Sequence, residues 1–149
     1  MPKLGRYLIV FIALLSLASL SRVSAASPQN RMSDHDVEQR MKNLLADTKH
    51  FRKSFNTAIG KSIMRKTSQA KDARQLVETF EGQMQDMLDS FRHSKKADPN
   101  LQSGIDTVPQ IDKIINDAQI TGVTTQQWSK VRTELVEIAQ AFNVAVNFR

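Results

Sequence analysis

The sequence predicts an all-α fold: an antiparallel up-down four-helix bundle that follows a cleaved signal peptide. After residue 33, apolar residues recur at three- and four-residue spacing in four separate segments, which is the period of an amphipathic helix. The 149 residues include only five glycines and four prolines, too few for the many turns of a β-sandwich or barrel. Because the links between the segments are short, consecutive helices are expected to run antiparallel.

Residues 1–25 have the layout of a secretory signal peptide. Lys3 and Arg6 precede the apolar run 8–20, and Ala25 supplies the small residue that signal peptidase requires. An uncleaved membrane anchor is the alternative, but the run is shorter than the roughly 20 apolar residues that a spanning helix needs. We therefore expect an exported chain, periplasmic or secreted, cleaved after Ala25 and without a transmembrane span in its mature part.

The first two helices are expected at about residues 34–59 and 69–94, after a flexible N-terminal segment 26–32. Ser33 is a good N-cap, and the acidic residues that follow it suit the positive end of a helix dipole. The two apolar stripes contain Val37, Met41, Leu44, Leu45, Phe51, Phe55 and Ile59, then Leu76, Val77, Phe80, Met84, Met87, Leu88 and Phe91. Between them, residues 60–68 break the helical pattern and are expected to form a loop.

The third and fourth helices are expected at about residues 99–120 and 125–142. Pro109 interrupts the third segment and predicts a kink or a restart, because proline lacks a backbone donor and disfavours helical geometry in the preceding residue. Thr124 and Gln127 match the spacing of a capping box at the start of the fourth helix. Residues 144–148 are apolar at alternate positions, which suggests that they pack across the end of the bundle. The whole of residues 33–149 is expected to form this one domain.

The sequence offers little that could carry catalysis. With no cysteine, the chain has no disulfide, thiolate nucleophile, iron–sulfur ligand or cysteine-containing zinc site. The three histidines of the mature chain, His35, His50 and His93, lie off the apolar stripes and are interpreted as surface residues. The acidic residues also lie off the stripes, so none is expected to be a buried carboxyl group with a raised pKa. We expect no catalytic residue, no cofactor and no metal site.

The positive charge is concentrated in one stretch of the chain. The formal charge of +6 falls to +3 once Lys3, Arg6 and Arg22 leave with residues 1–25. Residues 49–74 contain eight basic residues and a single acidic residue, Asp72. The candidate contact with an anionic partner consists of Lys61, Arg65, Lys66, Lys71 and Arg74, which we call the basic corner.

Two interpretations of the basic corner remain open. It is either a solvated tip of the bundle, or it is a contact for an acidic protein or an anionic envelope surface. Each basic residue near an anionic membrane contributes on the order of 1 kcal/mol to the binding free energy. Nucleic acid is not expected as a partner, because residues 56–79 contain no aromatic side chain on which a base could stack. The oligomeric state, and whether the core takes up a lipid, are left open.

Several short matches carry a resemblance to known proteins. They are Phe51-Arg52-Lys53-Ser54-Phe55, Phe80-Glu81 with Phe91, Ile111-Asp112, Trp128 with Val131-Arg132 and Leu135, and Ala141-Phe142-Asn143-Val144. With these residues the mature chain resembles a family of small exported all-helical bacterial proteins, a resemblance that implies a fold and no activity. More weakly, Val123-Thr124-Thr125-Gln126-Gln127 is similar to the Leu-Thr-x-x-Gln signature of the periplasmic chaperones Spy and CpxP, with valine in place of leucine and one copy where that family usually has two.

Three functional hypotheses follow. The first is an exported, non-enzymatic bundle that binds or scaffolds an envelope partner through the basic corner. The second is a periplasmic chaperone or stress adaptor, as the weaker resemblance implies. The third is metal or cofactor binding followed by catalysis; a haem site, for example, would need an inward histidine or methionine opposite another ligand, and the inward Met41, Met84 and Met87 are interpreted as core residues.

Overall fold

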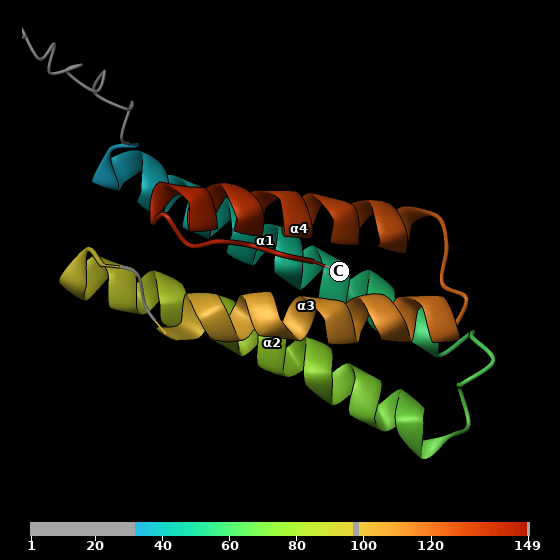
Figure 1. Cartoon of the computed structure of the whole chain (residues 1–149). Helices are drawn as coiled ribbons and strands as arrows, with labels where there is room; N and C mark the ends of the chain where they lie inside the picture. The colour runs from blue at the N-terminus through green and yellow to red at the C-terminus, as the bar shows by residue number, and fades with distance from the viewer. Residues whose placement is uncertain (1–31, 97–98, 149) are drawn as a thin grey trace, which may run out of the picture.

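The chain forms a bundle of four helices, and the predicted all-α fold is confirmed (Figure 1). The structure, a computed structural model, describes residues 32–96 and 99–148. The helices are α1 (Asp34–Ile59), α2 (Ser68–Ser94), α3 (Pro99–Asp117) and α4 (Val123–Ala141). α1 packs against both α2 and α4, and α3 packs mainly against α2. The predicted signal peptide lies outside the described residues, as does most of segment 26–32, of which Met32 packs against the core.

A single tryptophan links the helices inside the bundle. Trp128 on α4 is 3 % exposed, and its ring centroid lies 4.8 Å from that of Phe51 on α1 and 5.6 Å from that of Phe80 on α2. Its indole Nε1 donates a hydrogen bond of 2.7 Å to Asp112 Oδ1 on α3. The Arg132 guanidinium lies 3.2 Å from the same carboxylate oxygen. This side chain of α4 therefore contacts each of the other three helices, and its polar atom is satisfied as burial requires.

The helix ends agree with the sequence at α1 and differ from it at α4. Ser33 caps α1 as predicted, because its side chain accepts a hydrogen bond of 3.1 Å from the Asp36 backbone N–H. The capping box predicted at Thr124 and Gln127 is wrong. Gly122, with φ +76°, occupies the N-cap of α4, so the helix begins earlier and the Thr124 side chain is buried.

The structure differs from the sequence-based expectation at two further places. α3 continues through Pro109 as one helix, without the restart considered above; the proline itself is exposed, while Val108 and Ile111 on either side of it remain buried in the core and favour the continuous helix. The chain after α4 does not cross the end of the bundle. It runs back beside α4 (Figure 1), with Val144, Val146 and Phe148 packed against the core and the Phe148 ring centroid 5.0 Å from the Arg132 guanidinium carbon.

Candidate functional site

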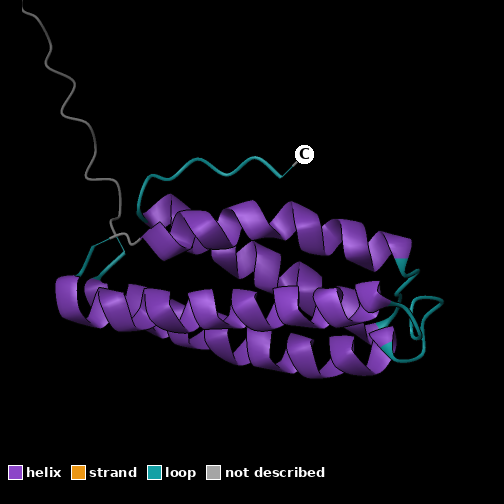
Figure 2. Ribbon diagram, turned by 90° about the horizontal axis from the view of Figure 1, so that it is seen from below, coloured by secondary structure: helices purple, strands orange, loops and turns teal. Residues whose placement is uncertain are grey.

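The basic corner lies at one end of the bundle. It comprises the loop between α1 and α2 together with the beginning of α2, and the connection from α3 to α4 lies at the same end (Figures 1 and 2). Lys61, Arg65, Lys66 and Lys71 are exposed, and Arg74 is half-buried beside Gly60. The structure thus brings together, on one end of the molecule, the five residues that the sequence singled out.

These cations have no acidic partner within the described part of the chain. Of the eight basic residues between positions 49 and 74, only Arg52 forms an ion pair with a described residue, Glu81 on α2. In contrast, the basic residues of the remaining described chain are ion-paired except Lys96. The positive charge of the corner is therefore uncompensated by the fold, and the like charges repel one another.

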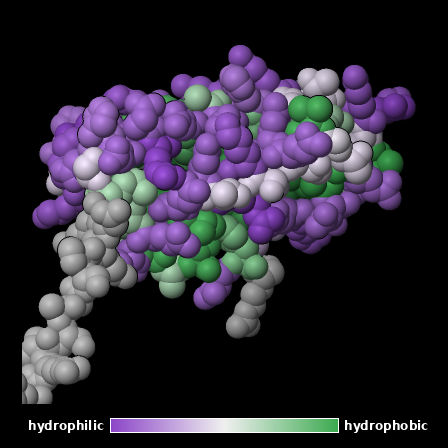
Figure 3. Space-filling model, turned by 90° about the horizontal axis from the view of Figure 1, so that it is seen from above, coloured by the Kyte–Doolittle hydropathy of each residue, from purple (hydrophilic) through white to green (hydrophobic). Residues whose placement is uncertain are grey.

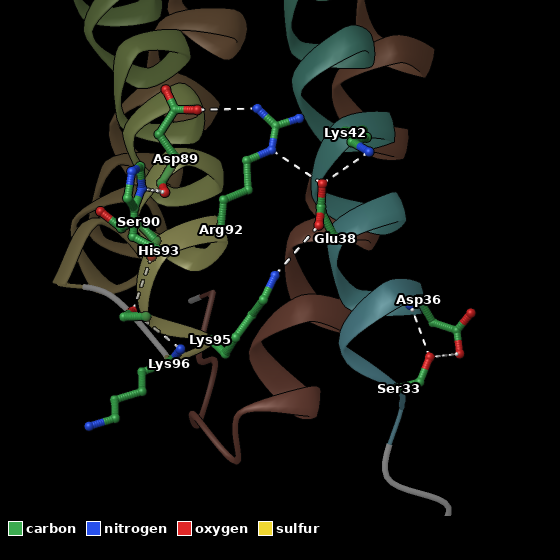
Figure 4. Close-up of polar contacts among 11 residues, drawn as sticks. Ser33, Asp36, Glu38, Lys42, Asp89, Ser90, Arg92, His93, Lys95 and Lys96 are labelled. Carbon is green, nitrogen blue, oxygen red and sulfur yellow. Dashed lines mark hydrogen bonds and ion pairs between the residues drawn. The ribbon is translucent and has the colours of Figure 1, made fainter.

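At the opposite end of the bundle, the basic side chains are neutralised by an acidic residue (Figure 4). The Glu38 carboxylate lies 3.0 Å from Lys42 Nζ, 3.2 Å from Arg92 Nε and 3.6 Å from Lys95 Nζ. Hydrogen bonds from Lys42 and Arg92 lower the pKa of Glu38 to about 2. One acidic side chain thus binds three basic ones at that end, an arrangement that has no counterpart among the described residues of the basic corner.

Short-range hydrogen bonds hold the loop of the basic corner in one conformation. Ser62 Oγ donates to the Ile59 carbonyl at 2.9 Å and accepts from the Met64 backbone N–H at 3.2 Å. The Thr67 hydroxyl donates to the Met64 carbonyl at 2.8 Å, and Lys61 N–H donates to the Ala58 carbonyl at 3.0 Å. The turns are therefore built from the loop's own polar groups, which leaves the basic side chains free to face solvent.

The N-terminus of α2 adds to the positive potential of the corner. Thr67 is the N-cap residue, but its side chain makes no capping hydrogen bond, and the first turn of α2 contains no acidic residue. The positive end of this helix dipole is therefore not neutralised by a side chain. Lys71 lies one turn into the helix, where the helix dipole makes a cation electrostatically unfavourable. An acidic residue at this position would stabilise the helix more than lysine does.

A pair of carboxyl groups between α1 and α4 corrects an expectation from the sequence. The Glu134 side chain is 18 % exposed, and its pKa is raised to about 7 by burial and by the neighbouring Asp47 carboxylate. Burial opposes ionisation of Asp47 as well, but its pKa is lowered overall by Lys130 and by a hydrogen bond with Glu134. Lys130 Nζ lies 2.7 Å from Asp47 Oδ2. The prediction that no acidic residue would be a buried carboxyl group with a raised pKa is therefore wrong.

The histidines lie at the surface and the inward methionines in the core. His35, His50 and His93 are exposed, and within the described ranges no group of three or more histidine and acidic side chains is placed to hold a metal ion. Met41, Met84 and Met87 are buried in the core. None of the described helices is long and apolar enough to cross a membrane.

Residues 123–127, which resemble the chaperone signature, are divided between core and surface. The Thr124 side chain is buried, while Val123 is 64 % exposed. Gln127 accepts a hydrogen bond from the Ser54 hydroxyl on α1, and the Thr125 hydroxyl donates to the Gly122 carbonyl at 2.8 Å. Packing and local hydrogen bonds at the start of α4 therefore account for Thr124, Thr125 and Gln127.

Two residues at or near these sites were not singled out from the sequence. Ile63 lies among the cations of the loop and is 71 % exposed; the available signal was the apolar pair Ile63-Met64 between Lys61 and Arg65. Glu134 is three residues after Val131, and this helical spacing placed it at the edge of the apolar stripe of α4.

Comparison of the chain with protein-family models, with curated proteins and with solved structures finds no match.

Proposed function

We propose that the protein is an exported, non-enzymatic helical bundle that binds an anionic partner in the cell envelope through the basic corner. The observation that carries the proposal is that, among residues 32–96 and 99–148, no acidic side chain forms an ion pair with Lys61, Arg65, Lys66, Lys71 or Arg74. Export rests on the signal-peptide layout of residues 1–25. The proposal defines the partner by one chemical property, a surface that presents negative charge.

Physical considerations support a binding role over a solvated tip. Clustered unpaired cations repel one another and cost stability, whereas the other end of the bundle neutralises similar residues through Glu38. Hydrogen bonds within the loop fix its backbone before binding, so little backbone conformational entropy is lost when a partner is bound. Such a contact speeds association and weakens as salt screens it.

The test compares two sets of neutralising substitutions in protein purified after export. The intact mass of the purified protein shows whether residues 1–25 have been removed. In the corner variant, Lys61, Arg65, Lys66, Lys71 and Arg74 are changed to Gln. In the control variant, five basic residues at the opposite end, Arg40, Lys42, Arg92, Lys95 and Lys96, are changed to Gln. Binding to isolated bacterial envelope is measured by sedimentation at about 50 mM and about 500 mM salt, concentrations that differ strongly in screening.

We expect the wild type and the control variant to bind at low salt and to be released at high salt. The corner variant should lose at least about tenfold in affinity, because each basic residue near an anionic surface contributes on the order of 1 kcal/mol. Far-ultraviolet circular dichroism checks that both variants remain helical. Equal losses in the two variants, or binding that salt does not weaken, would contradict the proposal.

A further inference from the structure

We propose that the anionic partner is a bilayer surface rich in anionic phospholipid headgroups, on which the bundle docks end-on with Ile63 entering the headgroup region. This inference rests on the proposed function and names the partner of the same corner. It depends on one observation that charge alone does not explain: an apolar side chain is presented to solvent among the unpaired cations.

The two most exposed large apolar side chains among the described residues lie at the end that carries the basic corner. The described residues include two exposed large apolar side chains, Ile63 at 71 % and Val123 at 64 %. Ile63 lies in the loop between α1 and α2, and Val123 begins α4 at the same end (Figures 1 and 2). On the face seen in Figure 3, hydrophilic residues predominate and apolar residues form separate small patches. The end of the bundle thus combines positive charge with isolated apolar groups.

The arrangement of the loop matches the layered chemistry of a lipid surface. Ile63 lies between Lys61 on one side and Arg65 and Lys66 on the other. These four residues and Ser62 line one shallow depression. Headgroup phosphates can pair with the ammonium and guanidinium groups, while the boundary with the acyl chains accepts the isoleucine side chain. A bilayer needs no complementary pocket for that side chain, so one exposed apolar residue is enough.

The loop that exposes Ile63 is held by its own hydrogen bonds. Ser62 and Thr67 fix the turns on either side of it through the hydrogen bonds to Ile59 and Met64 described above. The neighbouring Met64 is half-buried and packs against the core, so the loop directs one of two adjacent apolar residues inward and the other outward. Docking would therefore bury Ile63 without first having to order the loop.

An acidic protein is a less suitable partner for this surface. It would neutralise the cations, but it would leave Ile63 in water unless it also provided a matching apolar pocket. The loop is a projecting tip between two antiparallel helices (Figure 2), and a projecting tip fits a deformable planar surface without such a pocket.

The first experiment measures binding to vesicles of phosphatidylglycerol, to vesicles of phosphatidylcholine and to poly-L-glutamate. Ile63→Ser keeps every charge of the corner. A matched control, Val136→Ser, removes a half-buried apolar side chain on the side of α4. We expect Ile63→Ser to weaken binding to phosphatidylglycerol vesicles about fivefold, through the lost apolar burial, without changing binding to poly-L-glutamate. The wild type and Val136→Ser should bind these vesicles equally and should not bind phosphatidylcholine.

A second experiment reports the orientation of the bundle on the vesicle. Because the chain has no cysteine, a single cysteine introduced as Ile63→Cys or Ser94→Cys can carry an environment-sensitive fluorophore. On phosphatidylglycerol vesicles the label at position 63 should shift to shorter wavelength, and the label at position 94, at the other end of α2, should not.

Two outcomes would overturn the inference while leaving the proposed function in place. In the first, Ile63→Ser binds phosphatidylglycerol vesicles as tightly as the wild type and the label at position 63 does not shift, which indicates contact through charge alone. In the second, the protein binds poly-L-glutamate and not the vesicles, which indicates an acidic protein. Failure to bind either anionic probe would instead contradict the proposed function itself.

Discussion

At the residue scale, Glu134 shows how packing changes the chemistry of an ordinary side chain. It lies on α4 where α1 brings Asp47 beside it, and one of its oxygens, Oε2, is buried without a hydrogen-bond partner. Lys130 and Arg40 also face this site; both stabilise the ionised form of Glu134, and His50 acts on Asp47. Burial and the Asp47 carboxylate outweigh these cations, and the pKa of Glu134 rises to about 7.

This raised pKa predicts that the bundle loses stability as pH rises. The folded state holds the Glu134 proton more tightly than the unfolded chain, whose glutamate has the ordinary value of 4.5. The free energy of unfolding should therefore fall between about pH 4.5 and about pH 7 and then level off. Glu134→Gln stays neutral and removes this loss, so at pH 8 the variant should be more stable than the wild type by on the order of 1 to 3 kcal/mol.

Urea unfolding at pH 4.5 and pH 8 measures the difference. Glu78→Gln is the control, because Glu78 is an exposed glutamate on α2 without an ion pair in the described structure. Its stability should follow that of the wild type at both pH values. A Glu134→Gln variant that is less stable than the wild type at pH 8 would show that the ionised carboxylate stabilises the folded state.

At the element scale, the helices end through local hydrogen bonds of recognisable types. α3 and α4 both close with a residue of positive φ, Gln119 at 52° and Asn143 at 56°. In each case the following N–H reaches back five residues, from Ile120 to the Ile115 carbonyl at 3.0 Å and from Val144 to the Ala139 carbonyl at 2.9 Å. This is the Schellman arrangement, which satisfies the last carbonyl groups of a helix.

The N-cap of α1 offers a direct test of local stabilisation. Ser33→Ala removes the acceptor for the Asp36 N–H and should lower the free energy of unfolding by about 1 kcal/mol. The pKa of Asp36, lowered mainly by its hydrogen bond with the Ser33 side chain, should rise in this variant. Ser33→Asn retains a capping oxygen and should keep most of the stability. Denaturant unfolding and an NMR titration of Asp36 give the two readouts, and an unchanged stability in Ser33→Ala would contradict the assigned cap.

The sequence predicted the four helices because their period is local, and it failed where a position depends on a neighbouring helix. The stripe through Phe51 and Phe55 marks the buried side of α1 whatever packs against it. By contrast, Thr124 matched a capping pattern, but its actual environment depends on how α4 packs into the bundle. The spacing within α4 placed Glu134 at the edge of the apolar stripe, but its partial burial beside Asp47 depends on the contact with α1.

The candidate site was predictable to a similar extent. Its five basic residues are close in sequence, so their clustering at one end required only that a helix, a loop and a second helix form. Their lack of ion pairs could not be predicted, because it depends on where the acidic residues of α2, α3 and α4 come to lie. The outward direction of Ile63 and the inward direction of Met64 likewise follow from the turns of the folded loop.

At the scale of the whole molecule, the two ends of the bundle differ in how their charges are balanced. One end holds its cations around Glu38 (Figure 4). The other has five basic residues and one acidic residue between Lys61 and Arg74, with no ion pair among the described contacts. The protein therefore carries an electrostatic dipole along the bundle, which would orient it toward an anionic surface before contact.

Chemical footprinting of lysines on isolated bacterial envelope tests this central claim most directly. An amine-acetylating reagent is applied to the protein, free and bound, and the modified lysines are identified by mass spectrometry. Binding should protect Lys61, Lys66 and Lys71, whereas Lys42, Lys95 and Lys96 at the opposite end should react as in the free protein. Equal protection at both ends, or protection confined to the Glu38 end, would contradict docking through the basic corner.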